Sequence, residues 1–305
     1  MKRISNFTLK FNPIYLIPFF IFLLFCILLF DIKVDTGGDN VIYMILAKSI
    51  GDHNSYSNLH IVSSPPHNRF PPFFPLLLVP FYKVFGLNES FLKILPFISS
   101  IFSFIFLIFI IKDFWIVLVF SVTPILISYS SKLLSESTFL FFSLLAIYFV
   151  LKGNYFISSI FSTITFFIRN SGIALVFGLF TLLLIRKKFK DFLISATIFF
   201  IPTFLWFLRT RATLKSPEDT YYFDFIYKNP YNPEIGIIGF VDLLARIVQN
   251  IKIYVFQILP YNFLPFEDKS FLTLFGIIII FFVSFSFFRR IKRISIVELY
   301  FLFFL

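Results

Sequence analysis

Ionisable side chains that could do chemistry are concentrated between residues 31 and 93. This segment holds Asp31, Asp35, Asp39, Asp52, His53, His60, His67 and Arg69. A carboxylate can take a proton from a hydroxyl or amine nucleophile or help to bind a metal. The segment is therefore where we expect acid–base chemistry, and the seven-residue spacing of the three histidines is not taken as a metal site, because Pro65 and Pro66 prevent one continuous helix from aligning them.

Asp39 is the best placed of these carboxylates. It stands at the expected start of a helix over Val41–Ile50, after the turn-forming pair Gly37 and Gly38. At a helix start a carboxylate accepts backbone N–H groups and meets the positive end of the helix dipole, so we expect its pKa to be low. Two interpretations stay open, a reacting carboxylate or a helix cap only. Asp35 either shares this work or lies in a solvated turn.

The composition indicates which elements position these residues. Hydrophobic residues make up 58% of the 305 residues and charged residues 14%, against about 25% charged in soluble domains. An ordinary soluble enzyme is therefore excluded, and the single cysteine excludes an intrachain disulfide. Eight apolar runs approach the length of a membrane span: Ile14–Phe30, Ile94–Ile111, Phe114–Tyr129, Thr138–Leu151, Tyr155–Ile168, Ser171–Ile185, Phe192–Leu208 and Phe271–Phe288. The sequence predicts an all-α, polytopic membrane protein.

The distribution of basic residues predicts the orientation in the cell membrane. The net charge is +11, and the basic residues cluster between apolar runs, as topology signals do, which argues against nucleic acid as a partner. If Phe73–Phe85 and Ile237–Leu259 lie on the membrane surface, the clusters at 186–190 and 289–293 fall on the side of the N-terminus. The positive-inside rule then places the N-terminus in the cytoplasm.

This orientation divides the chain into a bundle and two outer segments. The outer segments run over about residues 31–93 and 209–270, within one transmembrane domain that covers 1–305. A further apolar run begins near Ile294 and reaches Leu305, which is too short for a bilayer core of about 30 Å. We therefore expect a C-terminally truncated chain.

Two charged residues interrupt the apolar runs. Glu136 either has a function at membrane depth, where an acid is costly, or lies in water at the tip of a hairpin. Lys132, four residues earlier, is a candidate ion-pair partner for it. Arg169 either binds phosphate or extends to lipid headgroups. His67 adjoins Arg69, which makes it the histidine expected to line the site.

Four motifs in order resemble those of GT-C glycosyltransferases. The families that look similar are the protein O-mannosyltransferases and the lipid A aminoarabinose (ArnT-like) transferases, and the resemblance covers roughly residues 1–210. The motifs are Asp39-x-x-x-Tyr43-x-x-x-Ala47, Pro71-Pro72-Phe73-Phe74-Pro75-Leu76 followed by Phe85-Gly86, Ser135-Glu136, and Arg169-Asn170-Ser171-Gly172.

The resemblance implies a fold, a reaction and residue roles. The fold would be a GT-C-like transmembrane helix bundle with juxtamembrane helices in the first outer loop. The enzyme would move a sugar from a polyprenyl or dolichyl phosphate to a protein, lipid or glycan acceptor at the outer face, with inversion. Asp39 would be the catalytic carboxylate, and a divalent cation stays open as a cofactor. Substrate would meet Asp35, Tyr43, His67, Arg69, Glu136 and Arg169.

Other classes of protein fit parts of the sequence. A polyprenyl-linked sugar flippase or secondary transporter would carry ionisable groups near the midplane in paired halves, whereas here they gather at one face. An inactive truncated remnant is a further reading of the end at Leu305. A glycan polymerase or ligase would keep the enzyme class and change the reaction.

Overall fold

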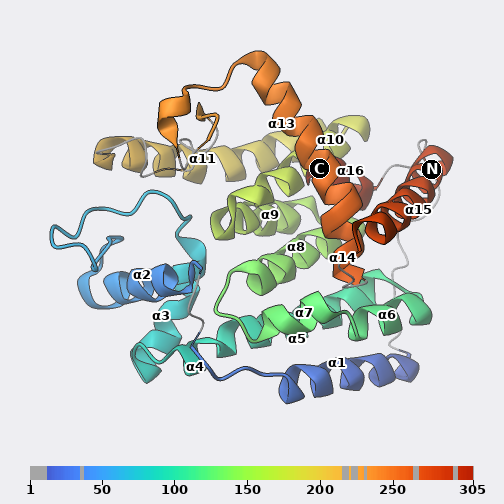
Figure 1. Cartoon of the computed structure of the whole chain (residues 1–305), viewed down its shortest axis with the longest axis horizontal. Coiled ribbons are helices and arrows are strands. Elements are labelled where there is room, and N and C mark those ends of the chain that lie inside the picture. Colours follow the sequence, from blue (N-terminus) through green and yellow to red (C-terminus); the bar gives the residue numbers. More distant parts are fainter. Residues whose placement is uncertain are drawn as a thin grey trace.

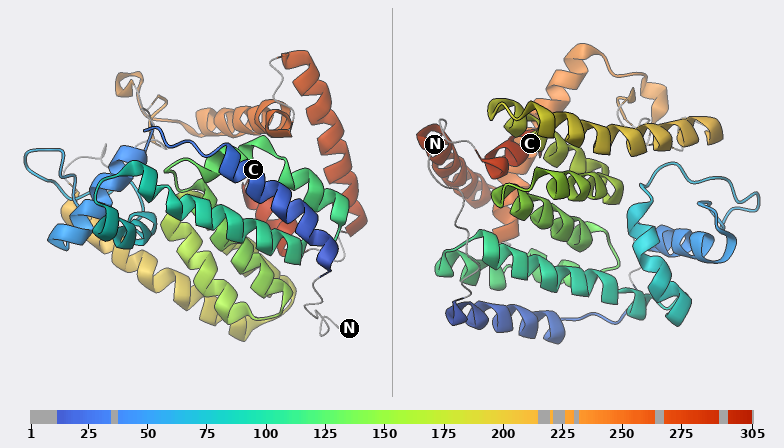
Figure 2. Two further views of the ribbon diagram at one scale, coloured as in Figure 1. Left: turned by 90° about the horizontal axis from the view of Figure 1, so that it is seen from below. Right: turned by 180° about the vertical axis from the view of Figure 1, so that it is seen from behind.

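Antiparallel apolar helices form the body of the molecule. The computed structural model describes residues 12–34, 38–214, 220, 226–229, 232–263, 268–290 and 295–304. Between residues 94 and 213 short loops join successive helices, which pack side by side (Figure 1 and Figure 2). The helices of the body are α1 (Leu16–Leu28, after the 3-10 turn Pro13–Tyr15), α5 (Ile94–Ile110), α6 (Phe114–Ser121), α7 (Pro124–Ser130), α8 (Glu136–Leu151), α9 (Tyr155–Ile168), α10 (Ile173–Ile185, after the 3-10 turn Asn170–Gly172) and α11 (Phe189–Thr213).

Small polar side chains let the central helices α5, α8 and α9 approach one another closely. The Ser99 and Thr138 hydroxyls lie 3.0 Å apart between α5 and α8, and Ser158 of α9 donates to the Ala146 carbonyl of α8 at 2.9 Å. All of these residues are buried. Small residues and interhelical hydrogen bonds are typical of helix contacts inside membranes, where burial of apolar surface gives little drive for association.

One predicted span is wrong in detail. The run Phe114–Tyr129 is not a single helix but the two helices α6 and α7, separated at Val122 and Thr123. Pro124 is the first residue of α7 and lacks an N–H group, and Thr123 before it is extended at φ −69° and ψ 116°. A proline disfavours helical geometry in the residue that precedes it, so the break follows from the sequence.

Length and hydropathy together support fewer spans than the eight expected. Among the described residues, the helices over Glu89–Ile110 and Phe189–Thr213 are long and apolar enough to cross a membrane. The other apolar stretches are shorter, for example 13 residues in α1 and Ser270–Phe281 within α15. Large apolar side chains nevertheless stay exposed along α1 and α11. Such faces are typical of helices that contact lipid.

The first outer segment folds into helices packed on one end of the bundle. These are α2 (Asn40–His53), α3 (Phe73–Phe85) and the short α4 (Glu89–Leu92), so helices are present where the sequence predicts them. Tyr43, Leu46, Phe74 and Leu78 form a buried cluster with Ile168 at the end of α9. The loops that follow α5, α8 and α10 lie at the other end (Figure 1). Those loops carry basic residues, among them Lys112, Lys152 and Arg186.

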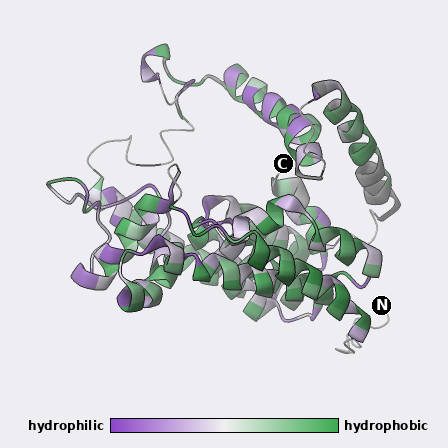
Figure 3. Ribbon diagram, turned by 60° about the horizontal axis from the view of Figure 1, so that its bottom comes forward, coloured by the Kyte–Doolittle hydropathy of each residue, from purple (hydrophilic) through white to green (hydrophobic). Residues whose placement is uncertain are grey.

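The C-terminal part adds a surface helix and two further helices. After the 3-10 turn Pro233–Ile235, α13 (Phe240–Ile253) continues through a π-helical turn (Tyr254–Ile258) into α14 (Leu259–Phe263). The helices α15 (Lys269–Arg290) and α16 (Ile296–Phe304) follow, and α16 packs on α10. Figure 3 shows hydrophobic residues along the bundle and hydrophilic ones on α13 and the outer loops.

Candidate functional site

Asp39 occupies the N-cap position of α2, but it does not act as a cap. Its side chain makes no capping hydrogen bond, and its backbone is helical (φ −85°, ψ −5°) and not extended as a capping residue usually is. Burial is the largest influence and raises the pKa of this carboxyl; Arg169 lowers it, Glu136 raises it and Arg69 lowers it. The low pKa expected from helix capping is therefore wrong, because the capping hydrogen bond does not form and burial raises the pKa of the carboxyl.

Glu136 and Arg169 form an ion pair beside Asp39. Arg169 Nη1 lies 2.6 Å from Glu136 Oε1, and the same nitrogen donates to the Ser135 hydroxyl at 3.2 Å. The Ser135 hydroxyl lies 3.3 Å from the hydroxyl of Tyr43. One polar chain thus links α2, the start of α8 and the end of α9. Lys132, the partner considered from sequence, lies instead over the ring of Tyr129.

A tight turn sets the position of Arg169. Arg169 ends α9 in an extended conformation (φ −146°, ψ 137°), and the 3-10 turn that follows folds the chain back into α10. A side chain on Gly172 would begin 2.5 Å from the backbone nitrogen of Phe166. Only glycine fits this approach, so the spacing from Arg169 to Gly172 has a steric cause.

His67 fixes the loop that presents Arg69. Its Nδ1 lies 2.8 Å from Asn58 Oδ1, and its Nε2 accepts the backbone N–H of Phe70 at 2.8 Å. Burial first, then the charge of Arg209 and that of Arg69, lower the pKa of His67 to about 4. The ring is therefore neutral near pH 7, and both nitrogens are engaged within the loop. Arg69 is exposed, and its charge acts on both Asp39 and His67.

Arg209 is a structural residue that sequence reasoning missed. The second outer segment was expected to begin at residue 209, but α11 continues to Thr213. From the last turns of α11, Arg209 donates to the carbonyl of His67 at 2.6 Å, to Asn68 Oδ1 at 2.6 Å and to the carbonyl of Tyr56 at 3.0 Å. Its guanidinium also lies 4.8 Å from the centre of the Trp206 ring. The three hydrogen-bond partners of Arg209 lie more than 140 residues away in the sequence, so no local pattern indicates them.

A small cavity opens beneath Glu136. Its volume is about 90 Å³, and it is lined by Tyr129, Ser137 and mostly apolar side chains of α1, α5, α7 and α8. The second oxygen of Glu136, Oε2, is buried and has no hydrogen-bond partner within the described part of the chain. Glu136 thus lies between the polar cluster, where it pairs with Arg169, and the mostly apolar cavity that it also lines.

The site brings together most of the residues predicted for it. Asp39, Tyr43, Arg69, Glu136 and Arg169 share one end of the bundle, and His67 supports the loop beside them. Asp35 lies outside the described residues. Within the residues that the structure describes, no group of three or more His, Cys, Asp or Glu side chains could hold a metal ion.

The fold is similar to that of a solved GT-C protein. The structure matches the crystal structure of ArnT from Cupriavidus metallidurans in the apo state, with a TM-score of 0.50 and 13% sequence identity. The match covers 85% of this chain and 56% of the ArnT chain, so this chain spans little more than half of ArnT. No protein-family model and no curated protein sequence matches the chain. The fold is therefore GT-C-like, and together with the apolar helices it indicates an integral membrane protein.

Proposed function

We propose that the protein is a membrane glycosyltransferase that moves a sugar from a polyprenyl or dolichyl phosphate to an acceptor on the extracytoplasmic face. The observation that carries the proposal is the half-buried carboxylate of Asp39 among Arg169, Glu136 and Arg69. A carboxylate supplies the base for such a reaction and guanidinium groups suit its phosphate leaving group. The cluster lies at the end of an apolar bundle, where the headgroup of an isoprenoid lipid would sit. The GT-C-like fold supports the same class.

The reaction needs little beyond these groups. An acceptor hydroxyl or amine attacks the anomeric carbon, the bond from that carbon to the phosphate oxygen breaks, and the electron pair stays on the phosphate. Asp39 takes the proton from the nucleophile, and burial makes it a stronger base than an exposed aspartate. Arg169 and Arg69 stabilise the charge that develops on the phosphate. Attack from the face opposite the leaving group inverts the anomeric centre.

The remaining predicted residues take supporting parts in this proposal. Glu136 holds Arg169 through their ion pair, and Tyr43 reaches the same guanidinium through Ser135. Asp35 belongs to the substrate-binding residues of the proposal. A divalent cation stays open as a cofactor, and the acceptor is a protein, lipid or glycan.

The proposed orientation follows from the two ends of the bundle. The loops with Lys112, Lys152 and Arg186 would face the cytoplasm together with the N-terminus, as the positive-inside rule requires. The end with Asp39 would then face outward in a cell membrane. On this proposal residues 1–305 form one transmembrane domain, with the outer loops that the sequence indicates.

The test is a transfer assay in membranes with a panel of radiolabelled polyprenyl-phosphate sugars. Asp39→Asn keeps the shape of the side chain but removes the base, so we expect transfer to fall about 10²- to 10⁴-fold. Asp52→Asn, at the other end of α2, is the matched control and should stay near the wild-type rate. Transfer by Asp39→Asn at the wild-type rate would remove Asp39 from the mechanism. Donor that crosses the bilayer without transfer would identify a flippase.

A further inference from the structure

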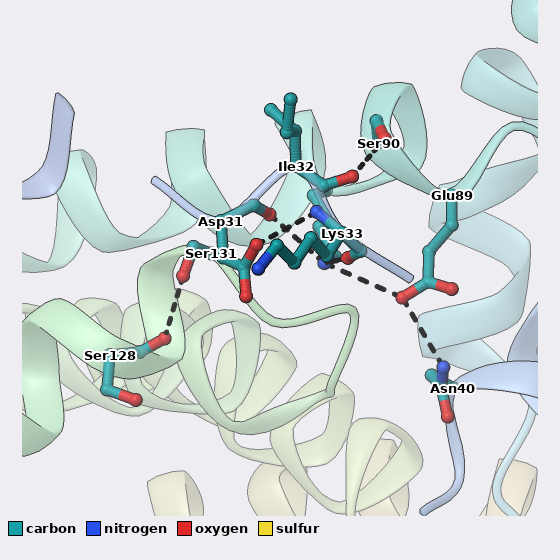
Figure 4. A network of polar contacts seen from close by, with 9 residues as sticks. Asp31, Ile32, Lys33, Asn40, Glu89, Ser90, Ser128 and Ser131 are labelled. Carbon is teal, nitrogen blue, oxygen red and sulfur yellow. Dashed lines mark hydrogen bonds and ion pairs between the residues drawn. The ribbon is translucent and has the colours of Figure 1, made fainter. Parts of the chain in front are cut away.

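A fully buried lysine binds the chain six to eight residues before Asp39. Lys93 stands where α4 passes into α5, and its side chain has no exposed surface. Its Nζ donates to the backbone carbonyls of Asp31 at 3.1 Å and Lys33 at 2.5 Å. One turn earlier, Ser90 donates to the carbonyl of Ile32 at 2.7 Å (Figure 4). Three consecutive carbonyls are therefore bound by one short stretch of helix.

The same stretch also holds the residue just after Asp39. Glu89 is buried and lies 3.7 Å from the ammonium of Lys93. Its Oε1 accepts a hydrogen bond of 3.4 Å from Nδ2 of Asn40, the first residue of α2 (Figure 4). Asn40 is fully buried as well. The Glu89–Lys93 pair thus contacts the chain on both sides of Asp39.

We infer that Glu89 and Lys93 are positioning residues for Asp39, which hold its carboxylate against Arg169 and the substrate. The inference rests on the proposed function. The side chain of Asp39 makes no capping hydrogen bond to its own helix that would fix its direction. Its place therefore depends on the chain on either side, where Lys93 binds the carbonyls of Asp31 and Lys33 and Glu89 binds the side-chain amide of Asn40.

The chemistry of the pair favours a positioning role over a contribution to stability. A buried ion pair is often no more stabilising than apolar side chains of the same volume, because taking two charges out of water is costly. A pair that adds little stability can still define one geometry for the chain that it binds. Since a displacement of about 1 Å at a reacting group can lower a rate about 10²-fold, such an anchor has a direct effect on turnover.

The test replaces the pair with apolar residues of similar size. The double variant Glu89→Leu/Lys93→Met leaves no unpaired buried charge, so it should keep the thermal stability of the wild type. We expect kcat with the polyprenyl-phosphate sugar panel to fall about 10²-fold while KM for the donor changes less than threefold. Glu89→Gln keeps an acceptor for Asn40 but leaves the buried ammonium of Lys93 without its counter-charge, so it should be less stable than the double variant. Lys48→Gln/Asp52→Asn removes an exposed pair from the far end of α2 and serves as the control.

A second readout does not depend on the reaction. A nitroxide label at Val41→Cys, an exposed site on the first turn of α2, reports local motion by electron paramagnetic resonance. Cys26 is buried, so the background labelling of the parent protein is low. We expect the label to become mobile in the double variant and to stay immobile in the Lys48→Gln/Asp52→Asn control. If the double variant does not fold, Asn40→Ala removes the side chain that bonds to Glu89 and gives the same readout.

The outcomes separate this inference from the proposed function. A mobile label with a low kcat supports positioning. An unchanged label, or a mobile label with full turnover in a protein that needs Asp39, overturns it. If Asp39→Asn transfers sugar normally, the proposed role of Asp39 fails and the positioning inference fails with it, even where the label shows that the anchor exists.

Discussion

The two outer segments of the molecule are built in opposite ways. In the first, α2 and α3 bury apolar side chains such as Leu46 and Leu78, and buried polar contacts fix the ends of their loops. In the second, no residue of α13 is buried, and its apolar side chains, Val241 and Val248 among them, are exposed. Both segments carry charged residues, but among the residues that the structure describes the first has a buried cluster of its own and α13 of the second contributes no buried residue.

This difference teaches where a catalytic site can be held. A reacting carboxylate would need neighbours that do not move, and Asp39 has Arg69 in its own segment, Glu136 at the start of α8 and Arg169 at the end of α9. The apolar face of α13 has a hydrophilic face opposite it, formed by Asp242, Arg246 and Gln249. A helix of this kind gains its stability from a lipid surface, so it suits contact with the membrane more than chemistry.

The same leucine truncation in both segments should give the greatest contrast. Leu46→Ala empties a fully buried position and should lower the free energy of unfolding by about 2–5 kcal/mol. Leu244→Ala on exposed α13 should change it by less than about 0.5 kcal/mol in detergent. Thermal unfolding of the two purified variants measures both. Equal losses would show that α13 has an interior partner.

Acid should loosen the first segment before the rest of the protein. The pKa of His67 is about 4 in the folded protein, below its ordinary value of 6.5. The free energy that neutral His67 contributes to folding is therefore fully present above pH 6.5 and is lost as the pH falls towards 4. The loss amounts to about 3 kcal/mol. Trp206 packs on Tyr56 of this loop, so its fluorescence in a Trp115→Phe background should change over this range. His67→Gln should abolish that titration, and a titration that survives would assign it to another group.

An arginine-to-lysine exchange compares Arg169, which lies beside Asp39, with Arg246 of α13. Arg169→Lys keeps the charge but loses the planar donor geometry, so transfer should fall about 10²-fold. Arg246→Lys is the matched control, because Arg246 of α13 donates to the carbonyls of Tyr227 and Lys228 and is not among the groups that act on the Asp39 carboxyl. Its transfer rate should stay within about twofold of wild type. A large loss in Arg246→Lys would bring α13 into the site.

The smallest effect concerns the depth of α13 in a membrane. Nitroxide labels at Ile247 and Ile251, both exposed, should be more accessible to oxygen than to a water-soluble nickel complex in liposomes, and a label at Gln249 should show the reverse. At the helical repeat of 3.6 residues per turn, Gln249 lies on the face opposite the two isoleucines. Equal accessibility at all three would place α13 in water.

The sequence predicts the helices of this fold better than their ends. Runs without charges, such as Tyr155–Ile168, appear as helices with the same bounds. The prediction of a single span over Phe114–Tyr129 was wrong because it relied on the hydropathy of the whole run. The helix breaks at Thr123, where Pro124 acts locally on the residue before it. The end of α11 was missed because Arg209, taken as the start of a loop, finds its partners in a distant loop.

The candidate site was predictable only in part, for a similar reason. Motif order indicates that Asp39, Glu136 and Arg169 belong together, and the structure places them together. The ion pair of Glu136 with Arg169 and the pKa of Asp39 depend on how three helices pack, which spacing along the chain does not give. Lys93 looked like an ordinary end of a loop, because the carbonyls that it binds lie 60 residues away.

The glycine at position 172 determines both the spacing of α9 and α10 and the position of Arg169. A methyl group at position 172 would collide with the backbone at Phe166. Any residue larger than glycine at position 172 would therefore have to displace α10 from α9. The same movement would carry the guanidinium of Arg169 off Glu136. The spacing of α9 and α10 and the Arg169–Glu136 ion pair are therefore expected to change together when this sequence is mutated. A random mutant library selected only for expression should already be depleted of substitutions at Gly172.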